Sequence, residues 1–126
     1  MNTQNKHLIE TLNGFCGSET AYTIPMFNIQ YTEGVKYLAD TAKCYWLLTD
    51  AAVITKRIKP KSSFLVVYFK RFSKELQERL HKEAQITYAD GNGTILLQQD
   101  YEYTDFPLDE LRLFCVEDML MLPNEY

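Results

Sequence analysis

The chain has 126 residues, of which 46% are hydrophobic and 13% aromatic, and its formal net charge is −4. This length predicts a single domain, residues 1–126, and the composition excludes an intrinsically disordered chain. The longest apolar run, residues 64–69, is too short to cross a bilayer, and residues 1–12 lack the features of a signal peptide. We therefore expect a cytoplasmic protein without a membrane segment.

The cysteines and histidines give no metal or disulfide pattern. Cys16, Cys44 and Cys115 are far apart in the sequence, and neither His7 nor His81 lies at a ligand spacing from them. An odd number of scattered cysteines argues against a disulfide framework and a zinc site. The sequence also lacks a glycine-rich phosphate loop. We expect reduced thiols, no metal site and no cofactor.

The first third of the chain predicts one short helix and a short strand. Residues 2–14 place Leu8, Ile9 and Leu12 on one helical face and end at an Asn-Gly pair. The following segment contains glycine, serine and proline, which interrupt helices, and predicts extended chain with a strand near residues 27–31.

The segment 33–57 is the strongest helical pattern in the sequence. Thr32 fits its N-cap position, and we expect Trp46 to be the largest side chain that it packs. The apolar spacing is compatible with one long helix and with two helices joined near Ala42 and Lys43, and both alternatives stay open.

The next elements predict strands. Residues 63–72 are rich in β-branched and aromatic residues, with apolar side chains on both faces, as in a central strand. Residues 73–83 fit either a helical turn or a long connection. Asp90–Gly93 ("DGNG") predicts a hairpin turn, and residues 95–103 alternate between apolar and polar side chains.

The stretch "YTDFPLDE", residues 103–110, contains three carboxylates around a proline. Proline fits the first turn of a helix, so we expect Asp105 at the N-cap, Asp109 and Glu110 in the first turns, and a late helix. A catalytic carboxylate pair is the alternative, but no histidine or nucleophile lies nearby in the sequence. We therefore expect no catalytic residues.

Together these elements predict an α+β fold. N-terminal helices would pack on a C-terminal antiparallel β-sheet of about three strands, formed around the "DGNG" hairpin, with the late helix after it. A short extended segment, residues 119–123, would follow that helix.

Charge is distributed unevenly along the chain. Residues 56–82 contain nine Lys or Arg and two acids, a net charge of +7, whereas the remainder carries −11. The two segments can neutralise each other, which is the interpretation that we favour. A nucleic-acid contact is an alternative, in which Tyr68, Phe69 or Phe72 stacks on bases. The basic candidates for a partner contact are Lys56, Arg57, Lys59, Lys61, Lys70 and Arg71.

An acidic surface is the mirror alternative. Asp100 and Glu102 fall on the outward face of their strand. With Asp105, Asp109 and Glu110 at the start of the expected helix, they could form a negative patch that binds a basic host protein. Such a patch would make the protein an inhibitor of a nucleic-acid-binding protein. A two-fold homodimer and an enzyme of unknown reaction are the remaining alternatives.

Two stretches carry a resemblance to a known family. "YTEGVKYLADTAKCYWLLTD", residues 31–50, and "YTDFPLDELRLF…MLMLPNEY", residues 103–126, resemble an uncharacterised family of small bacterial and mobile-element proteins with a domain of unknown function. Residues 73–83 match that family least well. The resemblance implies a plasmid, phage or accessory-gene context and no known activity. We therefore expect a non-enzymatic accessory protein that binds another macromolecule, most simply a protein.

Overall fold

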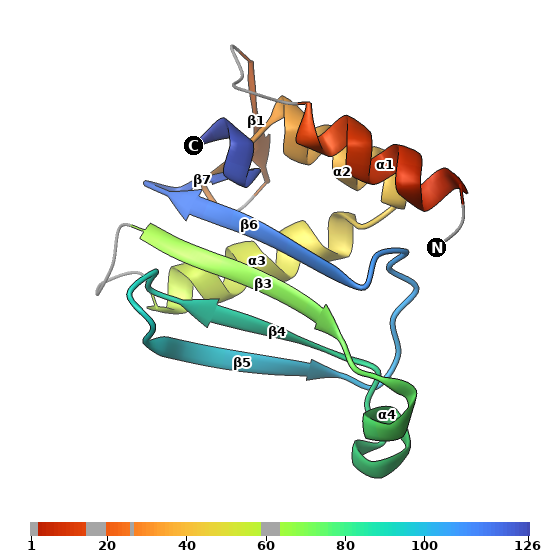
Figure 1. Ribbon diagram of the computed structural model, residues 1–126. Helices are drawn as coiled ribbons and strands as arrows, with labels where there is room; N and C mark the ends of the chain where they lie inside the picture. Colours follow the sequence, from red (N-terminus) through yellow and green to blue (C-terminus); the bar gives the residue numbers. More distant parts are fainter. Residues whose placement is uncertain (1–2, 15–19, 26, 59–63) are drawn as a thin grey trace.

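The computed structural model describes residues 3–14, 20–25, 27–58 and 64–126, which form an α+β fold (Figure 1). These residues contain four α-helices, one 3₁₀ helix and a seven-stranded sheet with the order β1-β2-β7-β6-β3-β4-β5. The elements are α1 (Thr3–Asn13), β1 (Ala21–Ile24), β2 (Ile29–Thr32), α2 (Glu33–Ala42), α3 (Tyr45–Ile58), β3 (Phe64–Arg71), α4 (Lys74–Leu80), β4 (Ala84–Ala89), β5 (Ile95–Tyr101), β6 (Glu110–Val116), β7 (Met119–Met121) and η2 (Pro123–Glu125).

The strong helical segment forms two helices. Thr32 caps α2 as expected, because its Oγ1 accepts a hydrogen bond of 3.3 Å from the N–H of Val35. α2 ends where Lys43 takes a left-handed conformation with φ 53°, and α3 starts at Tyr45. Trp46 is only partly buried, so it is not the large core residue that we expected. The largest fully buried side chains are Tyr88, Phe69 and Phe106.

The sheet is larger than the predicted three strands. The strand prediction near residues 27–31 is confirmed by β2, but β1, β6 and β7 were not predicted as regular strands of this sheet. β3 lies between β6 and β4, so its central position is confirmed. The sheet is also not purely antiparallel, since β2 and β7 run parallel to each other. No helix in the described ranges is long and apolar enough to cross a membrane.

The "DGNG" hairpin is confirmed. It joins β4 to β5, and both of its glycines have positive φ. The Asp90 carboxylate accepts hydrogen bonds from the N–H groups of Asn92 (2.8 Å) and Thr94 (3.1 Å). These bonds hold the pKa of Asp90 below its ordinary value. Before the hairpin, residues 73–83 contain the helix α4, whose N-cap is Ser73, so the helical alternative is correct.

The predicted late helix is wrong. Residues 110–116 form β6, which pairs with β3 along its whole length, and residues 119–121 form β7. "ELRLFCV" alternates in burial, with Leu111, Leu113 and Cys115 on one face. That pattern has the two-residue period of a strand. Pairing with β3 buries these side chains more completely than one face of an isolated helix would.

The C-terminal tail is tied to the start of α2. The Glu125 carboxylate accepts hydrogen bonds from Thr32 Oγ1 (2.6 Å) and Leu122 N (2.9 Å), and a longer one from Gly34 N (3.4 Å). A Cβ at Gly34 would lie 2.7 Å from Glu125 Oε1, so glycine is needed for this close approach. The two stretches that resemble the known family therefore meet in space.

One cluster of buried residues joins α1, α2 and α3 to the sheet, and α4 contributes no residue to it. On β3 and β6 the buried face carries Leu65, Val67 and Phe69 opposite Cys115, Leu113 and Leu111. α3 lies behind the sheet in Figure 1, and its Asp50 accepts a hydrogen bond of 2.8 Å from the Tyr101 hydroxyl of β5. The opposite face of β3 and β6 is partly exposed.

Candidate functional site

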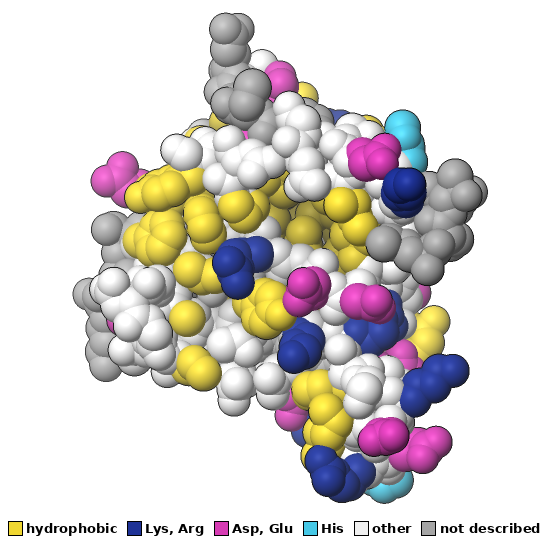
Figure 2. Space-filling model, in the orientation of Figure 1, with side chains coloured by type: hydrophobic (Ala, Val, Ile, Leu, Met, Phe, Trp, Pro, Cys, Tyr) yellow, Lys and Arg dark blue, Asp and Glu magenta, His cyan; other side chains and the backbone are white. Residues whose placement is uncertain are grey.

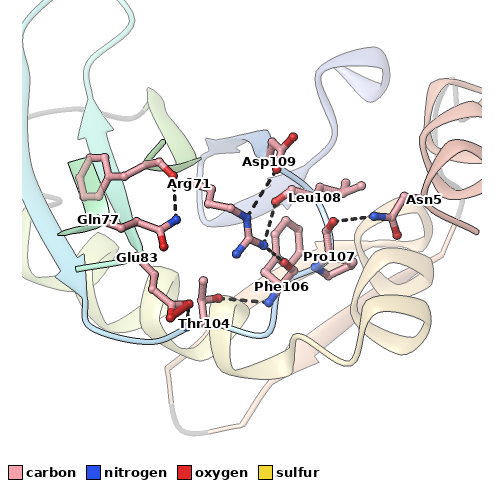
Figure 3. A network of polar contacts seen from close by, with 10 residues as sticks. Asn5, Arg71, Gln77, Glu83, Thr104, Phe106, Pro107, Leu108 and Asp109 are labelled. Carbon is pink, nitrogen blue, oxygen red and sulfur yellow. Dashed lines mark hydrogen bonds and ion pairs between the residues drawn. The ribbon is translucent and has the colours of Figure 1, made fainter. Parts of the chain in front are cut away.

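The acid-rich stretch forms a loop before β6 rather than a helix start (Figure 3). The Arg71 guanidinium donates hydrogen bonds to the main-chain carbonyls of Phe106 and Leu108 and lies 3.5 Å from Asp109 Oδ1. Phe106 is buried against Phe69, with ring centroids 4.8 Å apart. Two more hydrogen bonds hold the loop, from Asn5 Nδ2 to the Pro107 carbonyl (2.7 Å) and from the Thr104 N–H to Glu83 Oε1 (3.3 Å).

The three acids of this loop do not form a catalytic pair. Asp105, Asp109 and Glu110 are all exposed, and Asp109 is 92% exposed at its side chain. Asp105 does not cap a helix, because the N–H of Phe106 binds Thr104 Oγ1 at 3.1 Å and no helix follows. The helix-start explanation is wrong. The three carboxylates are exposed to solvent, whereas an acid-base pair needs two carboxylates that face a shared, enclosed pocket.

The basic candidates do not share one surface among the described residues. Lys56 and Arg57 belong to α3, whereas Lys70 and Arg71 belong to β3, where successive side chains point to opposite faces. Lys70 is exposed, and Arg71 is partly buried in the loop just described. Lys59 and Lys61 lie outside the described residues. Phe69 is fully buried, so it is not available to stack on a base.

Cations of the basic segment pair with acids of the C-terminal third. Lys82 Nζ lies 2.8 Å from Asp100 Oδ2, and Lys56 Nζ lies 3.7 Å from Asp118 Oδ2. With the Arg71–Asp109 pair, three ion pairs join the two segments among the described residues. These pairs agree with partial neutralisation of the two segments, and each contributes little stability because it is near the surface.

The acidic candidates are separated as well. Asp100 also accepts a hydrogen bond of 2.8 Å from Gln85 Nε2, so its carboxylate is occupied on both oxygens. Glu102 lines a shallow hollow beside Lys74 and Lys82, whereas Asp105 lines a different, aromatic hollow. The basic neighbours reduce the negative potential around Glu102.

The part of the chain that the structure describes contains no cluster of three metal-binding side chains. Cys44 and Cys115 are buried, and Cys16 lies outside that part. Burial raises the pKa of the Cys44 thiol to about 12, and its Sγ donates to the Leu38 carbonyl at 3.8 Å. This thiol is therefore protonated at neutral pH and is a core residue rather than a nucleophile.

The exposed face of the sheet is the most distinctive surface of the molecule (Figure 2). Hydrophobic side chains gather over β3 and β6 in this view, with a hollow below α1 and η2. The rings of Phe64, Phe114 and Tyr126 contact one another with centroids 5.2–5.5 Å apart. Partly exposed apolar side chains extend this area, and they are Val66, Val116, Met119 and Met121.

The hollow is a groove of about 410 Å³ between α1, η2 and the first half of β6. Its apolar lining comes from Ile9, Leu12, Leu108, Leu111 and Leu122. Asn124 Nδ2 donates a hydrogen bond of 2.8 Å to the Asn13 carbonyl and so joins the two walls, η2 and α1. The volume of the groove falls within the range of small-ligand pockets.

β6 presents a strand edge to this groove. β3 pairs with residues 110–116, but β7 pairs only with residues 114–116, so residues 110–113 have one strand neighbour among the described elements. The Arg71 N–H donates to the Asp109 carbonyl at 2.8 Å, which directs the backbone groups of Asp109 toward β3. By alternation, the backbone N–H and C=O groups of Glu110 and Arg112 point toward the groove.

Polar side chains stand beside this edge. The Tyr68 hydroxyl donates a hydrogen bond of 2.7 Å to Glu110 Oε2, and this bond is the main reason that the pKa of Tyr68 is raised. The Arg112 guanidinium lies 5.5 Å from the centre of the Tyr68 ring. No carboxylate in the described ranges forms an ion pair with Arg112. The groove therefore combines an apolar floor, an open backbone edge and a cation without an ionic partner.

The sequence reasoning missed this site. Arg112 is the single base in residues 100–118, which contain seven acids, and was not singled out from the sequence, whereas Tyr68 was considered only as a base-stacking candidate. The alternation in "ELRLFCV" was the available signal, since a strand there places Arg112 and Glu110 on one face. The sequence could not show that the groove also includes Ile9, Leu12 and Leu122, because their proximity to β6 depends on the tertiary fold.

Comparisons with known proteins give a family but no activity. A comparison with curated proteins found no match, and a comparison with solved structures found none either. A family model described as "Family of unknown function (DUF6876)" matches residues 6–126. Because this match covers nearly the whole chain, the protein belongs to that family of unknown function.

Proposed function

We propose that the protein is a non-enzymatic protein-binding module and that its binding site is the groove beside β6. The observation that carries this proposal is the unpaired backbone edge of residues 110–113 at an apolar groove. Such an edge is a template for an added strand, and the main-chain hydrogen bonds of strand addition give affinity without a catalytic group.

The geometry favours an extended partner segment. Four edge residues span about 13 Å, which matches a short strand. A segment that pairs with this edge would direct alternate side chains toward Leu111 and Leu122 in the groove and leave the others toward solvent.

The charge at the groove specifies the partner further. Arg112 has no ionic partner in the described chain, and Glu110 is already bound by the Tyr68 hydroxyl. An acidic side chain on the partner would gain a charge-assisted contact with Arg112. The proposed partner is therefore a protein segment with alternating apolar residues and a carboxylate that lies opposite Arg112.

The biological setting belongs to the same proposal. The resemblance of residues 31–50 and 103–126 to mobile-element proteins supports an accessory protein that acts on a host protein in the cytoplasm. A nucleic-acid ligand is the weaker candidate, because the basic side chains are dispersed and three of them pair with acids. Nucleic-acid binding would weaken steeply as salt increases.

A peptide experiment tests the proposal. The purified chain is titrated with extended peptides in which leucine alternates with polar residues and one position carries either Asp or Lys. We expect the Asp peptides to bind at least about fivefold more tightly, which corresponds to about 1 kcal/mol for an exposed charge pair. Peptides with N-methylated backbone positions, which cannot pair with a strand edge, should lose binding.

Two charge-reversal variants supply the control. Arg112→Glu should lose the preference for Asp peptides, whereas Lys74→Glu, an equal charge change on α4, should keep it. Binding that survives N-methylation would contradict strand addition, and an unchanged preference in Arg112→Glu would contradict the assigned charge contact. A measurement of molar mass by light scattering would show whether a homodimer covers the groove.

A further inference from the structure

A second hollow lies at the end of β5, away from the groove. Its walls are the rings of Trp46, Tyr101 and Tyr103, and the rim is completed by Thr104 and Asp105. The volume is about 210 Å³. Three aromatic residues therefore meet at one small site, Trp46 from α3, Tyr101 from the end of β5 and Tyr103 from the connection between β5 and β6.

The rings are arranged as a corner. The centroids of Trp46 and Tyr101 are 5.5 Å apart and their planes meet at 60°, so the two rings form adjoining walls. The side chain of Tyr103 is 74% exposed. Its ring is available to form a third wall.

The electrostatic environment is negative. The Tyr101 hydroxyl donates a hydrogen bond of 2.8 Å to Asp50 Oδ2, which increases the electron density of the Tyr101 ring. Asp105 adds a carboxylate at the rim, and no Lys or Arg is among the residues that line the hollow. Aromatic faces attract cations through their quadrupoles, and nearby carboxylates increase that attraction.

We propose that this hollow binds a quaternary ammonium group, either of a small molecule or of a methylated lysine side chain. A primary ammonium needs three hydrogen-bond acceptors, whereas the walls offer aromatic faces and one rim carboxylate. A methylated ammonium needs no such acceptors and fits aromatic walls. This site is independent of the groove and of the proposed partner segment.

Trp46 makes the test direct, because it is the only tryptophan in the chain. Its fluorescence is recorded during titration with choline, with a peptide carrying one trimethyllysine, and with 3,3-dimethylbutan-1-ol, the neutral carbon analogue of choline. We expect a saturable change with the cations and about tenfold weaker binding of the neutral analogue. The tighter of the two cationic ligands identifies the source of the ammonium group.

Two tyrosine variants provide a matched pair. Tyr103→Ala should weaken choline binding about threefold to tenfold. Tyr126→Ala removes an equally exposed tyrosine, 72% against 74%, outside the hollow and should leave binding unchanged. Equal binding of choline and its neutral analogue, or no saturable change with either cation, would overturn the proposal. Equal effects of the two tyrosine variants would overturn it as well.

Discussion

The two faces of β3 and β6 differ in how far their side chains are buried. On the helix-covered face, Leu65, Val67 and Leu113 are almost completely buried. On the other face, Tyr68 and Arg112 are partly or fully exposed beside an apolar groove. Because successive residues of a strand point to opposite faces, stability and recognition can be encoded in alternate positions.

The carboxylates of the acid-rich stretch lie outside the covered core and are exposed to water. Among them, Glu110 lines the groove and accepts a hydrogen bond from the Tyr68 hydroxyl on the open face. The comparison predicts that substitutions on the two faces separate stability from binding.

The largest expected effect comes from neighbouring residues on opposite faces. Leu113→Ala removes a fully buried side chain and should lower the free energy of unfolding by about 2–5 kcal/mol. Arg112→Ala, one residue away and exposed, should change it by less than about 0.5 kcal/mol. Urea denaturation of both variants checks the pair, and similar losses would contradict the assignment of the two faces.

The second prediction concerns Glu125 of η2, which joins the C-terminal tail to the start of α2. Glu125→Ala removes the acceptor for Thr32, Leu122 and Gly34 and should cost about 1–3 kcal/mol, because buried donors lose their partner. Thermal unfolding measures this loss. Glu110→Ala is the matched control and should cost much less, because the exposed Glu110 carboxylate accepts a hydrogen bond from the Tyr68 hydroxyl on the open face.

The third prediction concerns a buried hydroxyl group on the helix-covered face of the sheet. The hydroxyl of Tyr88 is buried, and no described group forms a hydrogen bond with it. Burial also raises the pKa of this phenol. Tyr88→Phe should therefore leave stability unchanged or increase it by up to about 1 kcal/mol, since an unsatisfied polar atom is removed. A lower melting temperature for this variant would show that the hydroxyl contributes a bond to the native state.

The smallest effect is a pH dependence at the open face. Hydrogen bonds from Lys82 and Gln85 hold the pKa of Asp100 below the ordinary value of 3.8. A depressed folded-state pKa stabilises the protein above about pH 4, and this contribution is lost as pH falls through the folded-state value. Asp100→Asn should reduce the stability lost between pH 5 and pH 3 by about 0.5 kcal/mol or less. If Asp100→Asn loses as much stability between pH 5 and pH 3 as the unsubstituted protein, the contacts of Asp100 with Lys82 and Gln85 do not contribute to the pH dependence.

Local sequence patterns predicted several elements correctly. The "DGNG" turn needs positive φ at glycine and carries its own carboxylate acceptor, so it does not depend on distant residues. The Thr32 cap and the helices after it follow from side chains within one turn. The central strand 63–72 follows from apolar residues on both faces.

The prediction of a late helix shows where local reasoning ended. Leu108, Leu111 and Cys115 are spaced like a helix face, and Leu111, Leu113 and Cys115 are spaced like a strand face. Proline and acids before this segment favoured the helix. The structure favours the strand because β3 supplies partners for every residue from Glu110 to Val116, and Arg71 fixes the preceding loop.

The sequence by itself determined the α+β class, the hairpin, the capped helices and the ability of the two charged segments to neutralise each other. Only the tertiary structure decided which strands are neighbours, and therefore where β6 lacks a partner and where the aromatic hollow forms. The physical reason is the separation along the sequence of the residues on which each feature depends. Caps and turns depend on residues within about four positions, whereas the groove joins Leu12 to Leu111 and Leu122, and the hollow joins Trp46 to Tyr101.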